Sequence, residues 1–247
     1  MSYGLCNLSV IGVRAKPSDK SELVTQILYG ESFKLLDQKE KWTRVRIHYD
    51  NYEGWISNKQ FKNISKNIFE KITREDDVLC RDLIGIIIDK DQNEQMIVLG
   101  SVLNSLNFLN QKFNGKINKI SQKEILKTAN LYMNSPYLWG GKSPFGIDCS
   151  GFTQMVYKLN GIKLNRDASK QAKQGKSLSS LDKSKPGDLA FFENKFGDII
   201  HVGIIMDKMK IIHAHGKVRI DNLDSSGIFN TKLNIYTHKL REVRSYL

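Results

Sequence analysis

Three residues of this 247-residue chain have the types and the order that nucleophilic catalysis requires. Cys149 follows a loop rich in glycine, and apolar residues recur at helical spacing after it, which predicts a cysteine at or near a helix N-terminus. Free backbone N–H groups and the positive end of the helix dipole lie there, and both favour the thiolate over the thiol. The alternative at this point is a small buried core residue, the commonest fate of a free cysteine.

Two histidines further along the chain could activate that cysteine. His201 begins an apolar, largely β-branched run, His213 lies in a second such run, and polar residues 207–210 between them predict a hairpin. With the turn centred there, the two histidines are cross-strand neighbours on one face. A nucleophilic cysteine needs an imidazole base, and that base needs a third group to hold its tautomer. Cys149, His201 and His213 suit these three roles, and His215 is the rival for the third.

Four motifs together resemble the NlpC family of bacterial cell-wall cysteine endopeptidases. They are YLWGG at 137–141, DCSGF at 148–152, PGDLAFF at 186–192, and HVGII followed by IIHA within 201–214. The resemblance covers roughly residues 119–247 and implies a papain-like α+β fold without a cofactor or a metal. It also implies that Cys149 is the nucleophile, His201 the base and His213 the third polar residue.

The regions that precede this part of the chain predict β structure. In residues 1–64, short apolar runs alternate with Pro, Gly, Asn and Asp turns, which is typical of a small all-β barrel. This region resembles a bacterial SH3 domain, which implies a module that binds wall peptides or shapes the site. Residues 65–118 predict strands and, partly by analogy, a second, degenerate SH3-like domain. The expected fold class is therefore α+β, with a papain-like cysteine peptidase domain at 119–247 preceded by one or two small SH3-like barrels.

The elements around the candidate site can also be predicted. Ser121 and Glu124 have capping-box spacing, and a helix face follows that ends before Pro136. A second short helix is expected over residues 167–174. From Val218 onward we expect further strands and turns, without an obvious catalytic group.

The composition limits the partners. The net charge is +12, and residues 119–247 hold 21 basic and 11 acidic side chains. This excess either attracts an anionic partner, such as a muropeptide rich in carboxylates, or is a solvated lysine-rich surface. The lysines are dispersed rather than clustered with aromatic residues, and the absence of a binding motif argues against nucleic acid. Apolar runs are too short for a membrane span.

The cysteines and the start of the chain indicate a compartment. Cys6, Cys80 and Cys149 are odd in number and widely spaced, which argues against a disulfide framework or a zinc site and for a reducing environment. The first residues lack the charged and apolar regions of a signal peptide, which predicts a cytoplasmic chain, although a trimmed sequence would look the same.

The resemblance implies a specific reaction. Family members with SH3 domains cut the γ-D-glutamyl–L-diamino acid bond of muropeptides that have a free N-terminal L-alanine. In this chain His201 would deprotonate Cys149, or the two would form an ion pair in advance. The thiolate would then attack the carbonyl, and water would release the acyl-enzyme. The backbone N–H of Cys149 is the candidate oxyanion donor, because it opens a helix.

The same resemblance implies four substrate-binding residues. Asp148 would meet the ammonium of the alanine, Ser150 and Tyr137 would hydrogen-bond the peptide near the scissile bond, and Tyr52 of the first barrel would close the alanine end. The structural alternatives are that Asp148 and Ser150 cap the helix and that Tyr137 packs.

Two other classes are open at this stage. A papain-like N-acetylmuramoyl-L-alanine amidase or acyltransferase would need no free amine on its substrate. A non-catalytic wall-binding protein would need no nucleophile, and the complete set of Cys149, His201 and His213 argues against it.

Overall fold

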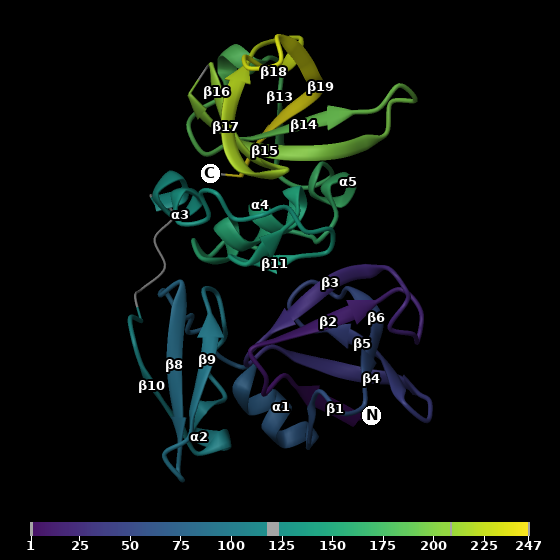
Figure 1. The fold of residues 1–247 in the computed structure, drawn as a ribbon, viewed down its shortest axis with the longest axis vertical. Helices are drawn as coiled ribbons and strands as arrows, with labels where there is room; N and C mark the ends of the chain where they lie inside the picture. The colour runs from purple at the N-terminus through teal and green to yellow at the C-terminus, as the bar shows by residue number, and fades with distance from the viewer. Residues whose placement is uncertain (1, 118–123, 208, 247) are drawn as a thin grey trace. The chain divides into compact units, whose positions relative to one another are not determined.

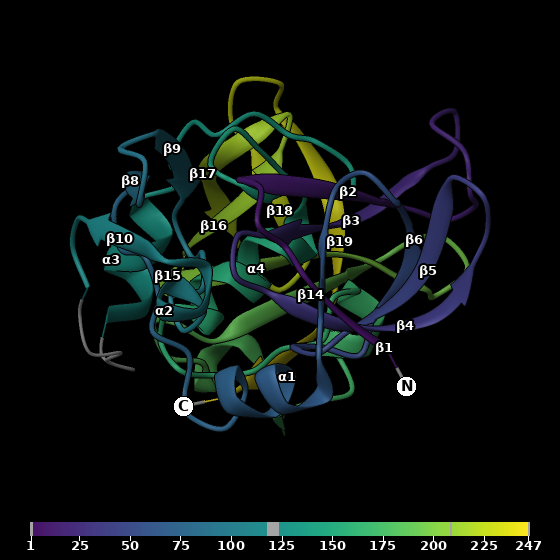
Figure 2. The same ribbon diagram turned by 90° about the horizontal axis from the view of Figure 1, so that it is seen from below.

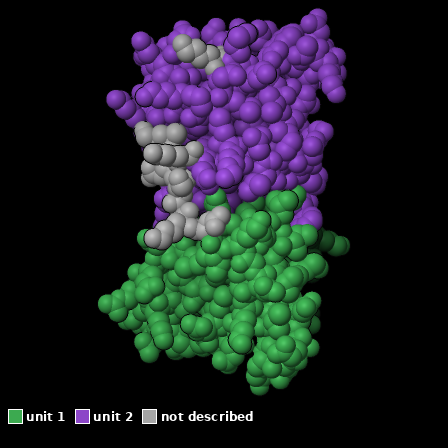
Figure 3. Space-filling view, turned by 90° about the vertical axis from the view of Figure 1, so that its left-hand side faces the viewer, with its two compact units in different colours: residues 1–119, 139–144 green, residues 120–138, 145–247 purple. Residues whose placement is uncertain are grey.

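The computed structural model describes residues 2–117, 124–207 and 209–246, so the predicted cap at Ser121 lies outside the described residues. The chain forms two compact units (Figure 3). The first comprises Met1–Lys119 and Trp139–Pro144, and the second comprises Ile120–Leu138 and Phe145–Leu247. Within the described ranges, no helix is both long enough and apolar enough to cross a membrane.

The first unit begins with an antiparallel sheet in the order β3-β2-β6-β5-β4-β1-β7, of which Figures 1 and 2 label β1 to β6. The strands are β1 Ser2–Leu5, β2 Val10–Arg14, β3 Leu23–Leu28, β4 Ser32–Gln38, β5 Trp42–Ile47, β6 Glu53–Ser57 and β7 Lys62–Ile64. Buried and exposed positions alternate along β5, because successive side chains of a strand point to opposite faces. This sheet confirms the prediction of an N-terminal all-β domain.

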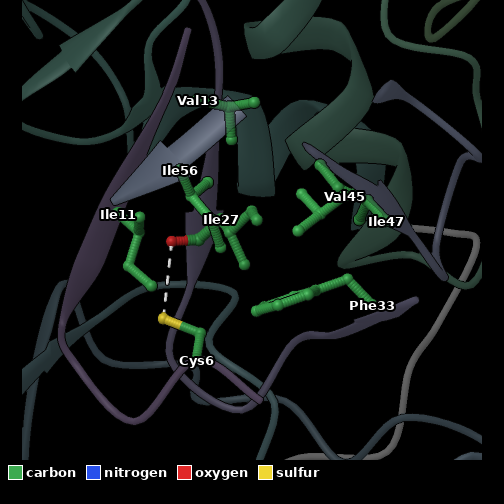
Figure 4. Packing of buried hydrophobic residues seen from close by; sticks show 8 residues of the cluster. All are labelled: Cys6, Ile11, Val13, Ile27, Phe33, Val45, Ile47 and Ile56. Carbon is green, nitrogen blue, oxygen red and sulfur yellow. Dashed lines mark hydrogen bonds between the residues drawn. The ribbon is translucent and has the colours of Figure 1, made fainter. Parts of the chain in front are cut away.

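The inward-facing side chains of this sheet form one apolar core (Figure 4). It consists of Cys6, Ile11, Val13, Ile27, Phe33, Val45, Ile47 and Ile56. All eight are fully buried. The core therefore gives the barrel its own hydrophobic stabilisation, independent of the second unit.

The rest of the first unit contains a smaller antiparallel sheet in the order β10-β8-β9. Its elements are α1 Lys66–Ile72, β8 Ile84–Asp89, β9 Glu94–Val98, α2 Leu106–Leu109 and β10 Gln111–Asn114. Helix α1 begins after Ser65, whose hydroxyl accepts a hydrogen bond from the backbone N–H of Ile68. Tyr29 of the barrel region packs in the core of the smaller sheet, beside Cys80. The division at 64 and 118 stays a prediction.

The segment Trp139–Pro144 belongs to the first unit, although the sequence places it within the predicted catalytic domain. The ammonium of Lys142 is fully buried and lies 3.5 Å from the carboxylate of Glu31. Gly140 has a φ of +78°, and a Cβ built on it would stand 2.3 Å from the carbonyl oxygen of Leu23. Only glycine suits this position, so one glycine of the YLWGG motif serves a close backbone approach.

The second unit is built on a sheet in the order β13-β19-β14-β15-β16-β17-β18, and β18 also pairs with β19, so the sheet closes on itself. Its strands are β13 Lys176–Leu178, β14 Leu189–Glu193, β15 Ile199–Asp207, β16 Lys210–His215, β17 Lys217–Leu223, β18 Gly227–Asn230 and β19 Ile235–Ser245. Strands β15 and β16 confirm the predicted hairpin, with Asp207 opposite Lys210. Closure brings the end of the chain back to strands that are distant in sequence.

Helices lie beside this closed sheet (Figure 1). They are α3 Ile125–Asn130, α4 Cys149–Lys158, α5 Ala168–Gln171 and the 3-10 helix η2 Leu181–Lys183; the short strands β11 Lys142–Ser143 and β12 Gly146–Ile147 precede α4. Every residue of α4 is buried, and the helix packs against β15 and β16. Helix α5 lies within the short helix predicted for residues 167–174. The observed architecture confirms the α+β class.

Candidate active site

Cys149 is the first residue of α4. Asp148, in an extended conformation with φ −91° and ψ 176°, is the N-cap, and its carboxylate accepts the backbone N–H of Gly151 at 2.7 Å. A carboxylate cap satisfies a backbone donor that the helix itself leaves open, which explains why α4 begins here. The prediction of a cysteine at a helix N-terminus is confirmed. Cys149 is 6% exposed, so its thiol is close to buried.

Asp148 is also engaged by an arginine that the sequence analysis did not single out. Arg166 donates from both terminal nitrogens to the two carboxylate oxygens of Asp148, at 2.9 and 2.5 Å, and also to the hydroxyl of Ser150 at 2.9 Å. Both members of the ion pair are buried. A bidentate pair of this kind is a strong hydrogen-bonding arrangement. The geometry therefore supports the structural alternative for Asp148 and Ser150, and their predicted contacts with substrate stay predictions.

The hairpin brings His201 of β15 and His213 of β16 together. Nε2 of His201 lies 2.8 Å from Nδ1 of His213, and both side chains are buried. Nε2 of His213 in turn lies 3.0 Å from a carboxylate oxygen of Asp221 on β17. We call His201, His213 and Asp221 the histidine network. His215 lies at the exposed end of β16 with its ring 6.1 Å from that of His213, so the structure places His213 against the base.

The sequence analysis did not single out Asp221, which the structure places against His213 in the region beyond Val218 where we expected strands and turns without an obvious catalytic group. The β16–β17 register pairs His213 with Arg219, and Asp221 comes two residues later on the same face of the strand. The available signal in the sequence was an acidic residue two positions after Arg219, within the predicted strand that follows the turn at Gly216.

A fourth imidazole packs against the base. The ring of His238, on β19, stacks on that of His201 with centroids 4.1 Å apart and an angle of 25° between the planes. Phe192 lies against both rings, at 5.7 Å from His201 and 6.0 Å from His238. These contacts restrict the orientation of the His201 ring. Sequence gave no signal for His238, because β19 reaches the site only through closure of the barrel.

Burial sets the charge of the histidines. Burial, and then repulsion by neighbouring imidazoles, hold the pKa of His201 well below its usual value. Burial also lowers the pKa of His213, against the opposing effect of Asp221. For Asp221 burial acts to raise the pKa, but the hydrogen bonds from His213 and Arg219 prevail and the pKa is lowered. At neutral pH the histidine network therefore consists of two neutral imidazoles and one carboxylate.

The thiol is protonated in the same state. Burial, followed by the Asp148 charge, raises the pKa of Cys149 to about 12, against hydrogen bonds from the backbone of Val202 and Ser150 and the charge of Arg166. In this state the Cys149 thiol and the His201 ring are both neutral, so they do not form an ion pair.

Tyr137 lies close enough to feel these charges. Burial, and after it the charges of Cys149 and Asp148, raise the pKa of Tyr137 to about 12, so its hydroxyl is protonated at neutral pH. The structure thus brings Tyr137 near the nucleophile. Tyr52 belongs to the first unit, where it is half-buried against the barrel core. The substrate contacts of both tyrosines stay predictions.

The described residues contain no group of three or more histidine, cysteine or acidic side chains arranged to hold a metal ion. Cys149 begins helix α4, which packs against the strands that hold His201 and His213, and these are the elements and residue types expected of a papain-like cysteine peptidase.

The chain belongs to the NlpC/P60 family of cysteine peptidases. The model of that family matches residues 134–236, and the model of the bacterial dipeptidyl-peptidase SH3 domain matches residues 13–61. The chain is 30% identical over 218 residues to a gamma-D-glutamyl-L-lysine dipeptidyl-peptidase of Bacillus subtilis, covering 77% of this chain and 71% of the relative. It is 28% identical to dipeptidyl-peptidase 6 of Lysinibacillus sphaericus, covering 85% and 88% of the two chains.

Solved structures share the fold. A crystal structure of an NlpC/P60 family protein from Bacillus cereus superimposes with a TM-score of 0.80 over 100% of both chains, at 22% identity. An NlpC/P60 endopeptidase from Photobacterium damselae gives a TM-score of 0.72 at 17% identity, over 97% of this chain and 70% of the other. The papain-like fold with an N-terminal SH3-like domain is thereby confirmed.

Proposed function

We propose that this protein hydrolyses the γ-D-glutamyl–L-diamino acid bond of cell-wall peptides with a free N-terminal L-alanine. The observation that carries the proposal is that one unit contains both the hydrogen-bonded histidine network and Cys149 at the start of α4. The names of the relatives, which describe removal of a dipeptide before lysine, support the choice of bond. A dipeptidyl-peptidase counts residues from a free N-terminus, so recognition of the amine is part of the proposal.

The reaction follows from the positions of the side chains. Nε2 of His201 is used by His213, which leaves Nδ1 as the nitrogen that accepts the proton of the Cys149 thiol. The sulfur attacks the γ-carbonyl carbon, and the backbone N–H of Cys149 is the proposed donor to the oxyanion. His201 then gives its proton to the departing amine of the diamino acid. A water molecule, deprotonated by His201, cleaves the thioester and releases L-alanyl-γ-D-glutamate.

The role proposed for Asp148 changes in the light of its contacts. Its carboxylate caps α4 and holds Arg166 in a buried pair, so replacing it leaves an uncompensated buried guanidinium. We therefore propose that Asp148 positions the Cys149 loop rather than binding the alanine ammonium. Asp148→Asn should lower the cleavage of free and N-acetylated peptides alike, whereas an ammonium-binding carboxylate would affect the free peptide selectively.

The test is hydrolysis of L-alanyl-γ-D-glutamyl-L-lysine, its N-acetyl form and its muramoyl form, with products identified by mass. We expect lysine and the dipeptide from the free peptide. Blocking the amine removes the ammonium charge of the alanine, and the loss of a buried charge pair should cost about 2–5 kcal/mol in transition-state stabilisation. The matched control is Cys149→Ala, which should cleave none of the three.

Each alternative predicts a different product. Comparable kcat/KM values for free and N-acetylated peptide would contradict the free-amine proposal. Release of the intact tripeptide from the muramoyl form would indicate an N-acetylmuramoyl-L-alanine amidase. Retention on sacculi without hydrolysis of any peptide would indicate a wall-binding protein.

We also propose that the enzyme acts in a reducing compartment. The support is that Cys6, Cys80 and Cys149 are all free thiols. Cell fractionation with an antibody tests this, and recovery of the protein only outside the cell would contradict it.

A further inference from the structure

The far end of the histidine network is a carboxylate whose two oxygens have separate partners. Oδ2 of Asp221 faces Nε2 of His213 at 3.0 Å, and Oδ1 accepts a hydrogen bond from the guanidinium of Arg219 at 2.7 Å. We propose that Asp221 is a positioning residue that selects the reactive tautomer of His201, two rings away. The proposal rests on the peptidase function proposed above, because it assigns a role within that reaction.

The first step concerns His213. An ionised carboxylate can only accept hydrogen bonds, so the Nε2 of His213 that faces Asp221 must carry the proton. A neutral imidazole has one proton, and burial keeps His213 neutral at physiological pH. Nδ1 of His213 is therefore an acceptor.

The second step carries this requirement to the base. Nδ1 of His213 lies 2.8 Å from Nε2 of His201, so Nε2 of His201 must be the donor and carry that ring's single proton. The lone pair of His201 is then on Nδ1, the nitrogen available to take a proton from the Cys149 thiol. Without a fixed acceptor at the position of Asp221, either tautomer of the pair of rings would satisfy the hydrogen bond between them.

Among the described residues, the neighbours of the histidine network include two further imidazoles and a guanidinium. The groups that face the two rings are the imidazoles of His215 and His238, with His238 stacked on His201 and His215 beside His213. Arg219 is the cation at the other oxygen of Asp221, at 2.7 Å. Among these neighbours, Asp221 is the anion that holds the tautomer.

Asp221→Asn tests the proposal with little change in shape. Arg219 still needs an oxygen acceptor, so the amide should turn its oxygen to Arg219 and its NH2 group to His213. Nε2 of His213 then becomes the acceptor, the protons of both rings move to Nδ1, and His201 loses its reactive lone pair. We expect kcat to fall on the order of 10³- to 10⁴-fold, as in a serine-peptidase triad when an amide imposes the wrong tautomer.

A double variant distinguishes tautomer control from a structural role. In Arg219→Ala/Asp221→Asn the amide is free to rotate its oxygen toward His213, so we expect at least about tenfold more activity than in Asp221→Asn alone. Arg219→Ala alone should stay within a few-fold of wild type, because the carboxylate remains. If the double variant is no more active than Asp221→Asn, the proposal is wrong. Asp182→Asn, an exposed carboxylate of η2, is the control for loss of one charge.

A direct measurement needs neither substrate nor a variant. Nitrogen-15 NMR of the imidazoles in the substrate-free protein reports which ring nitrogen carries the proton. We expect Nε2–H on both His201 and His213 in the wild type, and Nδ1–H on both in Asp221→Asn. A wild-type His201 protonated on Nδ1 would overturn the inference. If the protein cleaved no peptide while the tautomers were as expected, the proposed function would fail and the tautomer assignment would stand.

Discussion

Cys6 and Cys149 are both buried thiols, one in each unit, and the contrast between them shows what makes a cysteine reactive. Cys6 is fully buried in the barrel core, where its sulfur donates a weak hydrogen bond to the carbonyl oxygen of Ile27 at 3.7 Å (Figure 4). Cys149 is nearly as buried, and its backbone hydrogen-bond partners are Ser150 at the start of α4 and Val202 on β15. Burial raises the pKa of both thiols, so burial alone does not separate them.

Backbone hydrogen bonds do not separate the two thiols either, because they act to lower the pKa of both, through Leu8 at Cys6 and through Val202 and Ser150 at Cys149. The unit that holds Cys149 also holds the neutral imidazole pair of His201 and His213, while the apolar cluster described around Cys6 contains no imidazole. The proton of Cys149 therefore has an acceptor within its own unit. We propose that the same residue type fills the core in one unit and serves as the nucleophile in the other.

Truncating each cysteine should give opposite results, and this is the largest effect expected. Cys149→Ala should abolish peptide hydrolysis and leave the fold intact, because the nucleophile has no substitute. Cys6→Ala should keep kcat and lower the free energy of unfolding by about 1–2 kcal/mol, because it leaves a small cavity in the core. Steady-state kinetics and urea unfolding of both variants measure this. An inactive, stably folded Cys6→Ala would break the comparison.

The effects of replacing the histidines should rank in the order of their proposed roles. His201→Ala should cost nearly as much as loss of the cysteine, because members of one catalytic unit are not additive. His213→Asn should be milder, because an amide can still hydrogen-bond the His201 ring. His215→Ala is the control at the exposed end of β16. If kcat falls as far in His215→Ala as in His213→Ala, our choice of third residue is incorrect.

Acid should destabilise the second unit more than the barrel core around Cys6. His201, His213 and His238 are buried with lowered pKa values, that of His238 to about 3, while an unfolded histidine titrates near 6.5. Below about pH 6.5 the unfolded chain thus binds more protons, so the free energy of unfolding falls with pH, by up to about 1.4 kcal/mol per pH unit for each imidazole. Above that range these groups should contribute no pH dependence.

Urea unfolding from pH 7 to pH 5 measures that effect. His238→Phe should reduce the slope of the free energy of unfolding against pH by the contribution of one imidazole. It serves as the matched variant because it keeps an aromatic ring against His201. A free energy of unfolding that stays constant over this range would contradict the assignment of buried neutral histidines.

Local patterns predicted the parts of the site that lie close together in sequence. Helix α4 and the β15–β16 hairpin follow from periodicity, glycine and a polar turn, and these place Cys149, His201 and His213. Arg166 could not be predicted, because its pairing with Asp148 depends on how a loop packs across the start of the helix.

Longer-range pairing explains the other omissions. His238 lies against His201 because β19 pairs with strands that are distant in sequence and closes the sheet. Asp221 lies near His213 because of the register between β16 and β17. The glycine loop was identified as a turn, yet the membership of Trp139–Pro144 in the first unit depends on tertiary contacts such as that between Lys142 and Glu31. Single-residue spacing carries no information on such contacts.

Alkylation of the folded protein tests the central claim most directly, since it compares the three cysteines in one sample. Iodoacetamide near neutral pH, followed by peptide mass mapping over time, gives a rate for each thiol. We expect Cys149 to react first, ahead of Cys6 and Cys80, because the proton that its thiol loses can pass to His201 during the reaction. His201→Ala should slow Cys149 alone. Equal labelling of all three cysteines in the folded protein would contradict the account.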